Sequence, residues 1–345
     1  MSLAIILFII ASVTTVIAAI QLAKYGNGIA ESTGLGHSLV GLVLLSAATS
    51  LPELFSSSSA SFIGNVDLSF GNVFGSNMTN IFILVILDFF VKKSPILFGA
   101  SQKNVMTGGI VILITCVTLL MIFIGLHPDL QGYDHWYFSL VLLLFYVGGM
   151  IIIYKYEKAN LSDDSADHEK TSSSMTKKQA VTGFIISSVF VFGAAILLSY
   201  SSDIMSQYKI GGKALGGTFV GTLFMAFTTS LPEIVVSISA LKMGSRDMAL
   251  GNLFGSNLFN LAILSFSDGF YRLGSYFREV PLKGNAFSII SPNHFISGLI
   301  GIIFIAIVLS SLMLRRKEKH GPLGFDTLTI GILYIASIYL LYLLR

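Results

Sequence analysis

The chain has 345 residues, of which 54% are hydrophobic and only 11% are charged, and its mean hydropathy is +0.80. So few charges could not cover the surface of a soluble protein of this length, which excludes that class and favours a polytopic membrane protein. The formal net charge of +3 does not suggest a nucleic-acid partner, and the single cysteine, Cys116, excludes a disulfide within the chain.

Ten apolar segments are long enough to cross a bilayer, which requires about 20 residues of helix. Because the hydrocarbon core offers no water to backbone polar groups, we expect all ten to be helices. In chain order they are 2–24, 36–60, 68–91, 104–126, 136–154, 179–201, 215–241, 248–271, 293–314 and 324–344. The first lacks a preceding positive charge and a small-residue cleavage site, so we interpret it as a span rather than a signal peptide.

The second segment contains the sequence TSLPE at Thr49–Glu53. Proline has no N–H and clashes with the carbonyl four residues earlier, so Pro52 should free carbonyls near Ala48 and Thr49. A carboxylate in mid-bilayer costs about 2.5–3.5 kcal/mol and is functional by default, which makes Glu53 a candidate ligand. Freed carbonyls, hydroxyls and a carboxylate are hard oxygen donors that suit Na⁺ or Ca²⁺ rather than a soft metal.

The third segment contains GNVFGSNMTN at Gly71–Asn80. Its two glycines are four residues apart, a spacing that lets helices approach closely. Ser76 and Asn80 are also four apart and therefore share one helix face, which we expect to turn toward the carboxylates. For Asn72 and Asn77, and for their copies Asn252 and Asn257, the simpler interpretation is a hydrogen bond between helices.

Two further acids lie near the ends of this segment. We interpret Asp67, in the short loop before it, as a helix-capping residue, because a helix N-terminus favours acids. Asp88 lies near the other end, where anchoring or packing explains it better than ion ligation. Asp247 and Asp268 repeat the two positions in the second half of the chain.

A polar loop at about 155–178 divides the chain into a first part at 1–154 and a second part at 179–345. Its core, DDSADHEKTSSS, is acidic and serine-rich, which is typical of a solvated linker. The loops on this side of the predicted membrane hold 15 of the 21 Lys and Arg residues, so the positive-inside rule assigns this side to the cytoplasm. Both termini are then predicted to be extracellular.

The two parts are copies of one sequence. Residues 41–90 aligned without gaps on 221–270 are identical at 22 of 50 positions, with a constant shift of 180 residues. Each copy has five spans, an odd number, so the second copy enters the membrane from the opposite side. The sequence therefore predicts an all-α polytopic fold of ten transmembrane helices in two inverted five-helix repeats, an arrangement typical of secondary transporters.

At these motifs the sequence resembles the sodium/calcium exchanger branch of the cation/calcium exchanger superfamily. The motifs are ATSLPE, its copy TTSLPE at 228–233, and two GNxxGSNxxN segments, which together cover about 100 residues. The resemblance implies a midplane cation site formed by spans 2, 3, 7 and 8. Its implied metal ligands are Glu53, Glu233, Thr49, Thr229, Ser50, Ser230, Ser76, Ser256, Asn80 and Asn260.

One position departs from part of this family. Potassium-dependent and some prokaryotic members carry Asp where this chain has Asn260, so the centre of the predicted site has only two acids. This difference argues against potassium dependence. The GNxxE motif typical of the proton-coupled branch does not replace TSLPE here, and the short cytoplasmic loop fits a protein of the prokaryotic cell membrane.

These observations predict a secondary active antiporter that exchanges Ca²⁺ for Na⁺ by alternating access, with spans 1 and 6 as the sliding helices. A Ca²⁺/H⁺ antiporter on the same scaffold is the alternative, since carboxylates in apolar surroundings take up protons readily. A channel is a more distant alternative. An intramembrane enzyme is disfavoured because no histidine lies at mid-span. We expect no cofactor and no obligatory protein partner; the expected partners are the two ions and the bilayer.

Overall fold

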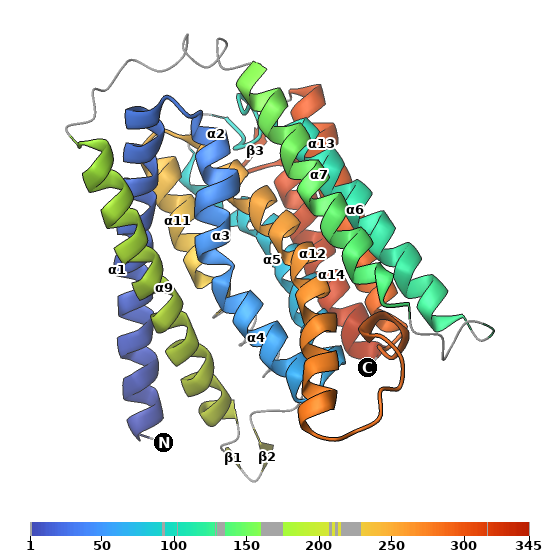
Figure 1. Cartoon of the computed structure of the whole chain (residues 1–345). Coiled ribbons are helices and arrows are strands. Elements are labelled where there is room, and N and C mark those ends of the chain that lie inside the picture. Colours follow the sequence, from blue (N-terminus) through green and yellow to red (C-terminus); the bar gives the residue numbers. More distant parts are fainter. Residues whose placement is uncertain are drawn as a thin grey trace. The chain divides into compact units, whose positions relative to one another are not determined.

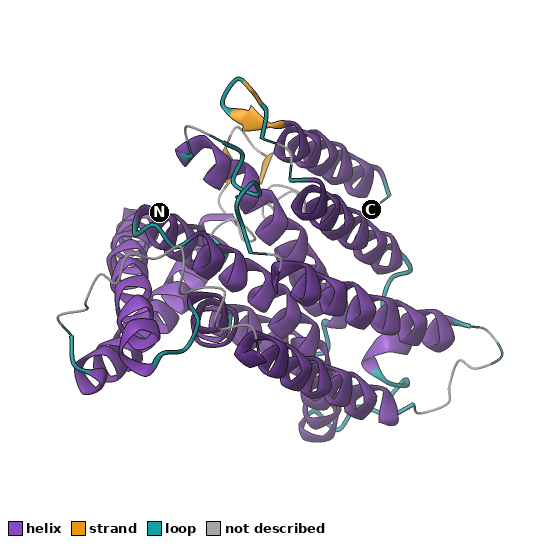
Figure 2. Cartoon of the chain, turned by 90° about the horizontal axis from the view of Figure 1, so that it is seen from above, coloured by secondary structure: helices purple, strands orange, loops and turns teal. Residues whose placement is uncertain are grey.

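The computed structural model describes residues 2–91, 94–101, 103–127, 129, 135–159, 175–206, 209–210, 213–214, 229–315 and 317–344. Within these ranges nearly the whole chain is helical, and the strands form two short antiparallel hairpins (Figure 2). The chain divides into two compact units: unit 1 is Met1–Pro52 with Lys158–Gly255, and unit 2 is Glu53–Glu157 with Ser256–Arg345. Each unit draws helices from both copies of the repeat.

Unit 1 begins with the long helix α1 and the first part of the broken second span (Figure 1). Its elements are α1 (Ser2–Thr33), α2 (His37–Leu39), the π-helical turn η1 (Val40–Leu45), α3 (Ser46–Thr49), α9 (Lys177–Ser206), β1 (Lys209–Ile210), β2 (Lys213–Ala214), α11 (Leu231–Lys242) and the start of α12 (Arg246–Phe277). A buried apolar cluster of Ile29, Ala30, Val40 and Ala180 joins α1, η1 and α9.

Unit 2 contains the remaining helices. They are α4 (Leu51–Phe62), which starts at the boundary, α5 (Val66–Phe90), α6 (Lys103–Leu126), α7 (Tyr137–Ala159), the rest of α12, the 3₁₀ turn η2 (Ala286–Ser288), α13 (Asn293–Leu314), β3 (Lys319–His320), β4 (Leu323–Gly324) and α14 (Phe325–Leu343). The α13 helix packs against α5, α6 and α14.

The described helices agree with most of the predicted spans. Eight are long and apolar enough to cross a membrane, and a ninth span is the bent pair His37–Thr49 and Leu51–Phe62. The remaining prediction, 215–241, is described only from residue 229 onward, and 215–228 lies outside the described residues. The membrane-spanning windows of α5 and α12 are 72% and 83% buried, against 17% for α14, so the two helices with the GN motifs are the ones most enclosed by protein.

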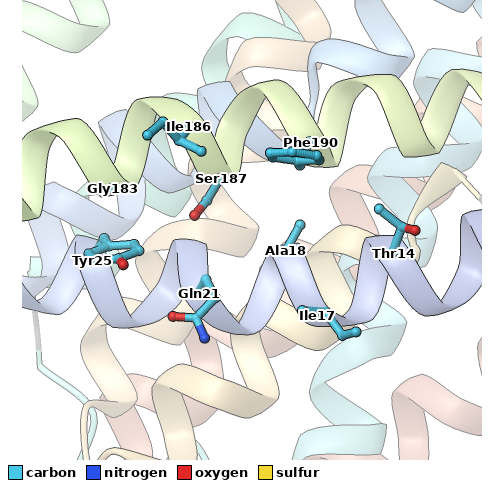
Figure 3. A pocket seen from close by; sticks show the side chains of 9 residues that line it. All are labelled: Thr14, Ile17, Ala18, Gln21, Tyr25, Gly183, Ile186, Ser187 and Phe190. Carbon is cyan, nitrogen blue, oxygen red and sulfur yellow. The ribbon is translucent and has the colours of Figure 1, made fainter.

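The helices α1 and α9, which correspond to the predicted spans 1 and 6, lie side by side within unit 1 (Figure 1). A Cβ at Gly28 would meet Ala180, whereas a Cβ at Gly183 would meet Tyr25. Later residues of α9 therefore lie beside earlier residues of α1, and the two helices run in opposite directions. A groove lies between them, with a volume of about 400 Å³. Figure 3 shows the side chains that line it, among them Tyr25 and Ala18. Several of its lining side chains are large, apolar and exposed, as a lipid-facing surface requires.

The predicted close approach of small residues holds for the second GN motif. A Cβ atom at Gly251 or Gly255 would overlap the carbonyl oxygens of Ser38 and Leu42, so α12 packs directly on the backbone of α2 and η1 within unit 1. A Cβ at Gly75, in the first motif, would meet no described atom within 4 Å. The neighbours that the repeat predicts for it lie at 222 and 226, outside the described residues.

Asp88 is a packing residue, as predicted. Its carboxylate is fully buried and accepts hydrogen bonds from the Ile96 N–H (2.7 Å), the Gly324 N–H (2.6 Å) and the Thr327 hydroxyl (2.7 Å). The Lys319 Nζ lies 3.1 Å from its Oδ1. The end of α5 is thereby fastened to the following loop, to the β3–β4 hairpin and to α14.

Asp268 repeats this role on α12. It accepts hydrogen bonds from the Ala286 N–H at 2.8 Å and the Ser139 hydroxyl at 2.7 Å, and it pairs with Arg272 at 3.1 Å. In both copies of the repeat, a buried acid in the second half of the GN helix therefore pairs with a basic side chain and accepts from the backbone of the segment that follows.

The capping interpretation of Asp67 is wrong. The N-cap of α5 is Asn65, whose side chain accepts from the Leu68 N–H at 3.2 Å. Because Asn65 occupies the capping position, the Asp67 carboxylate in the first turn instead accepts from the Ser291 N–H at 2.6 Å and lies 3.1 Å from the His294 Nε2. It attaches the start of α13 to the start of α5.

Candidate functional site

The first TSLPE motif breaks its helix as predicted. The α3 helix ends at Thr49, Ser50 has φ −93° and ψ 6°, and α4 then begins with Pro52 in its first turn. Proline is tolerated there because the N–H it lacks would have no partner within the helix. The Ala48 carbonyl, four residues before Pro52, therefore receives no N–H from that position.

The second TSLPE motif has the same local form. Ser230 is the N-cap of α11 with φ −83° and ψ 3°, and Pro232 lies in the first turn. The Thr228 carbonyl, which the sequence predicts to be freed by this proline, lies outside the described residues. Two chain segments 180 residues apart thus start a helix with Leu-Pro-Glu after a serine that leaves helical geometry.

Both candidate glutamates are buried. Glu53 and Glu233 are each 1% exposed, and each lies in the first turn of its helix. A helix N-terminus carries unpaired N–H groups and the positive end of the macrodipole, which favour a carboxylate and offset part of its cost of burial. Glu53 belongs to unit 2 and Glu233 to unit 1, and their meeting at one ion stays a prediction.

Within unit 1 the two motifs come into contact. The Ser50 hydroxyl donates to the Glu233 Oε1 at 3.2 Å, which joins the break in span 2 to the carboxylate of span 7. The Thr49 hydroxyl donates to the Ser46 carbonyl at 3.3 Å and lies 3.4 Å from the Asn252 Oδ1. Thr49, Ser50 and Glu233, three of the predicted ligands, are therefore close to one another and buried.

Within unit 2 four asparagines form a reciprocal set between α5 and α12. The Asn80 Nδ2 donates to the Asn257 Oδ1 at 3.0 Å, and the Asn260 Nδ2 donates to the Asn77 Oδ1 at 3.0 Å. The Asn77 Nδ2 also reaches the Asn257 carbonyl at 3.4 Å. The Oδ1 atoms of Asn80 and Asn260 are buried and have no hydrogen-bond partner among the described residues.

The remaining predicted ligands are buried hydroxyl residues. Ser76 and Ser230 are each 1% exposed, and their Oγ atoms likewise have no hydrogen-bond partner in the described part of the chain. Ser256 is fully buried and Thr229 is 1% exposed. Buried polar atoms are normally satisfied, so four orphan oxygens on the residues chosen as ligands are consistent with a bound cation.

Sequence reasoning missed two serines next to these residues. The Asn72 Nδ2 donates to the Ser57 Oγ at 2.9 Å, and the Asn252 Nδ2 donates to the Ser237 Oγ at 3.1 Å. The same bond therefore joins the GN helix to the TSLPE helix in both copies, which confirms the predicted role of these asparagines. The signal was present, because both serines lie four residues after a candidate glutamate and are identical in the two copies.

The donors in these positions are of one chemical kind. They are carboxylate, amide and hydroxyl oxygens, the ligands that hard cations prefer. Among the described residues, no three His, Cys, Asp or Glu side chains lie close enough to hold a metal ion together. Of the ten predicted ligands, two are carboxylates and eight are neutral oxygen donors.

Long apolar helices, a proline-broken span and buried acidic and amide side chains define a polytopic membrane transporter. The chain belongs to the sodium/calcium exchanger protein family, whose model matches residues 3–155 and 179–345. The resemblance seen in the motifs is thereby confirmed. A member of this family is a transporter rather than an enzyme.

Individual relatives and structures agree with this assignment. The chain is 27% identical over 309 residues to an uncharacterised membrane protein of Methanocaldococcus jannaschii, covering 89% of this chain and 86% of the relative. It is 25% identical over 277 residues to the sodium/calcium exchanger MaX1 of Methanosarcina acetivorans, covering 72% and 78%. A solved structure of the sodium-calcium exchanger NCX_Mj matches with a TM-score of 0.70 at 20% identity, over 98% of each chain, and shows the same fold.

Proposed function

We propose that the chain is a secondary active antiporter that exchanges Ca²⁺ for Na⁺ at a site shared by two inverted repeats. The observation that carries this proposal is the pair of buried glutamates, Glu53 and Glu233, each in the first turn of a helix that starts at a proline. A buried acid in a membrane protein is expensive and marks ion pathways. The similar protein MaX1 is a sodium/calcium exchanger, and from this likeness we take Na⁺ and Ca²⁺ as the exchanged ions.

The direction of equivalent helices supports inversion. Within unit 2, Ser69 on α5 bonds Ser267 on α12 at 2.7 Å, whereas Asn77, further along α5, bonds Asn257, further back on α12. These repeat-related helices run in opposite directions, as α1 and α9 do in unit 1. Helices related by a two-fold axis in the membrane plane have this property, which parallel repeats would lack.

The proposed site combines the acids with neutral oxygens from both copies. Its ligands are Glu53, Glu233, Thr49, Thr229, Ser50, Ser230, Ser76, Ser256, Asn80 and Asn260. The two carboxylates carry a charge of −2, which one Ca²⁺ or two Na⁺ would neutralise. Because the same carboxylates would serve both ions, the ions compete and the site empties by exchange. A site that empties only by exchanging one ion for the other performs antiport rather than channel conduction.

The rest of the mechanism follows from the topology that we propose. The Lys- and Arg-rich loops are cytoplasmic, both termini are extracellular, and the membrane is that of a prokaryotic cell. The paired helices α1 and α9 are the proposed moving elements. They contact each other along their length, and their outer faces carry exposed apolar side chains that tolerate sliding against lipid.

Transport by the purified protein in lipid vesicles tests this proposal. We expect an outwardly directed Na⁺ gradient to drive ⁴⁵Ca²⁺ uptake, and an imposed pH gradient of similar size to drive none. Uptake that ignores the Na⁺ gradient but follows the pH gradient would favour the Ca²⁺/H⁺ alternative. Conductance without coupled counterflow would instead indicate a channel.

A further inference from the structure

Asn77 and Asn257 hold the same position in the two copies of the repeat and lie between α5 and α12 within unit 2. Asn77 is 6% exposed and Asn257 is fully buried. Each accepts, through its Oδ1, the amide N–H of a candidate ligand from the opposite copy: Asn257 from Asn80 and Asn77 from Asn260, both at 3.0 Å. The pairing is therefore crossed, since the ligand on each helix is held by the other helix.

The direction of these bonds determines what the ligands present. An asparagine amide has an oxygen that accepts and a nitrogen that donates two N–H groups, and rotation about χ2 exchanges them. A cation is attracted by the oxygen and repelled by the N–H groups. With the Nδ2 atoms of Asn80 and Asn260 committed to the opposite helix, the oxygens that remain are the buried Oδ1 atoms, which have no hydrogen-bond partner among the described residues.

We infer that Asn77 and Asn257 are positioning residues that fix the amide orientation of Asn260 and Asn80, so that both present their oxygens to the transported cation. This inference rests on the proposed function. It adds that neither copy of the repeat can orient its own amide ligand. Occupancy of the site and the packing of α5 against α12 are thereby coupled.

Unit 2 also contains an interhelical hydrogen bond that does not orient a candidate ligand. Asn72 donates its amide to Ser57 at 2.9 Å and joins α5 to α4, but it orients no candidate ligand. Asn72→Ala is therefore a matched control for the loss of a helix-packing hydrogen bond. A residue that acts only through packing would behave as Asn72 does.

Equilibrium Ca²⁺ binding by the purified full-length protein measures the effect. We expect Asn257→Ala and Asn77→Ala each to weaken Ca²⁺ affinity about tenfold, through the loss of one orienting hydrogen bond. Asn72→Ala should lower the melting temperature and leave the affinity unchanged. Asn257→Asp keeps the accepting oxygen and replaces an Nδ2 without a described partner by an anionic oxygen, so it should bind Ca²⁺ at least as tightly as the unsubstituted protein.

Double mutants identify the residue through which each positioning residue acts. The effect of Asn257→Ala on Ca²⁺ affinity should vanish in an Asn80→Ala background and persist in an Asn260→Ala background. The converse should hold for Asn77→Ala, whose partner is Asn260. Equal effects in both backgrounds, or an affinity that follows only the melting temperature, would overturn the positioning role. Absence of Ca²⁺ binding by the unsubstituted protein would overturn the proposed function as well.

Discussion

The two candidate glutamates are both buried and potentially charged, a combination that is costly inside a membrane. Glu53 and Glu233 are each 1% exposed, although a carboxylate at mid-bilayer costs about 2.5–3.5 kcal/mol. Their place in the first turn of a helix supplies N–H groups and a favourable dipole, and the preceding proline makes that turn possible. Proline and glutamate are thus adjacent for a physical reason, because the break creates the helix N-terminus that stabilises the charge.

Neutralising either glutamate should abolish transport. Loss of a charged ligand costs about 2–5 kcal/mol, so Glu53→Gln and Glu233→Gln should each reduce Na⁺-driven Ca²⁺ uptake about 30-fold or more. Uptake into vesicles with matched amounts of protein measures the effect. Glu31→Gln is the control, since this acid is exposed and bonded only to Asn27 among the contacts described for it. Near-normal uptake by either glutamate variant would refute the proposed ligands.

The sequence predicts the roles of some of these residues and not of others. The breaks at Pro52 and Pro232 follow from local chemistry, and the importance of the glutamates follows from their repetition. The amide orientation of Asn80 was not predictable, because it depends on which residue of an antiparallel helix lies opposite. Asp67 was misassigned for a local reason, since Asn65 competes for the same capping position and takes it.

At the scale of elements, contact between α12 and the start of the second span depends on glycine. The Ser38 carbonyl oxygen occupies the space in which a Cβ at Gly251 would lie. Gly251→Ala must therefore displace backbone, and we expect it to destabilise the protein by about 1–3 kcal/mol. Thermal unfolding in detergent measures the loss.

Gly269, on the same helix, is the matched control. A Cβ at Gly269 would meet no described atom within 4 Å, and replacing a glycine inside a helix by alanine gains about 0.5–1 kcal/mol. Gly269→Ala should leave the melting temperature unchanged or raise it. If both variants unfolded at the same temperature, the close packing at Gly251 would be contradicted.

The end of α5 depends on a single buried acid. Asp88→Ala would leave the N–H groups of Ile96 and Gly324 without their acceptor, at a cost of about 3–5 kcal/mol. The Lys319 ammonium would lose its carboxylate partner and keep the carbonyls of Asp88, Val91 and Pro322. We expect a large fall in melting temperature. Asp129→Ala, which removes an acid that is 89% exposed, should cause almost none. A stable Asp88→Ala protein would show that the hairpin and α14 are held by other contacts.

At the scale of the whole chain, most of the individual spans were predictable from the sequence but the compact units were not. Hydropathy and length identify each helix from its own residues, and nine of the ten predicted spans coincide with described helices or the bent pair. The two units mix helices from both copies of the repeat, such as α1 with α9 and α5 with part of α12. This mixing depends on contacts between residues far apart in sequence, which composition does not encode.

The orientation of the chain in the membrane provides a test at the same scale. Single cysteines at Glu318 and Glu279, both exposed, are introduced in a Cys116→Ser background, because the native cysteine is itself exposed. The positive-inside rule predicts that a membrane-impermeant maleimide added to intact cells labels Glu279→Cys and not Glu318→Cys. Labelling of Glu318→Cys alone would invert the topology, and equal labelling of both would contradict the predicted arrangement of the last spans.

The central claim is that one cation is shared by the carboxylates of Glu53 and Glu233. An experimental structure of the protein with bound Ca²⁺, in which anomalous scattering locates the ion, tests it most directly. We predict a single Ca²⁺ with oxygen atoms of both glutamates about 2.3–2.6 Å away, accompanied by the amide oxygens of Asn80 and Asn260. An ion bound by only one of the two glutamates, or carboxylates turned toward separate partners with Ca²⁺ elsewhere, would contradict the account.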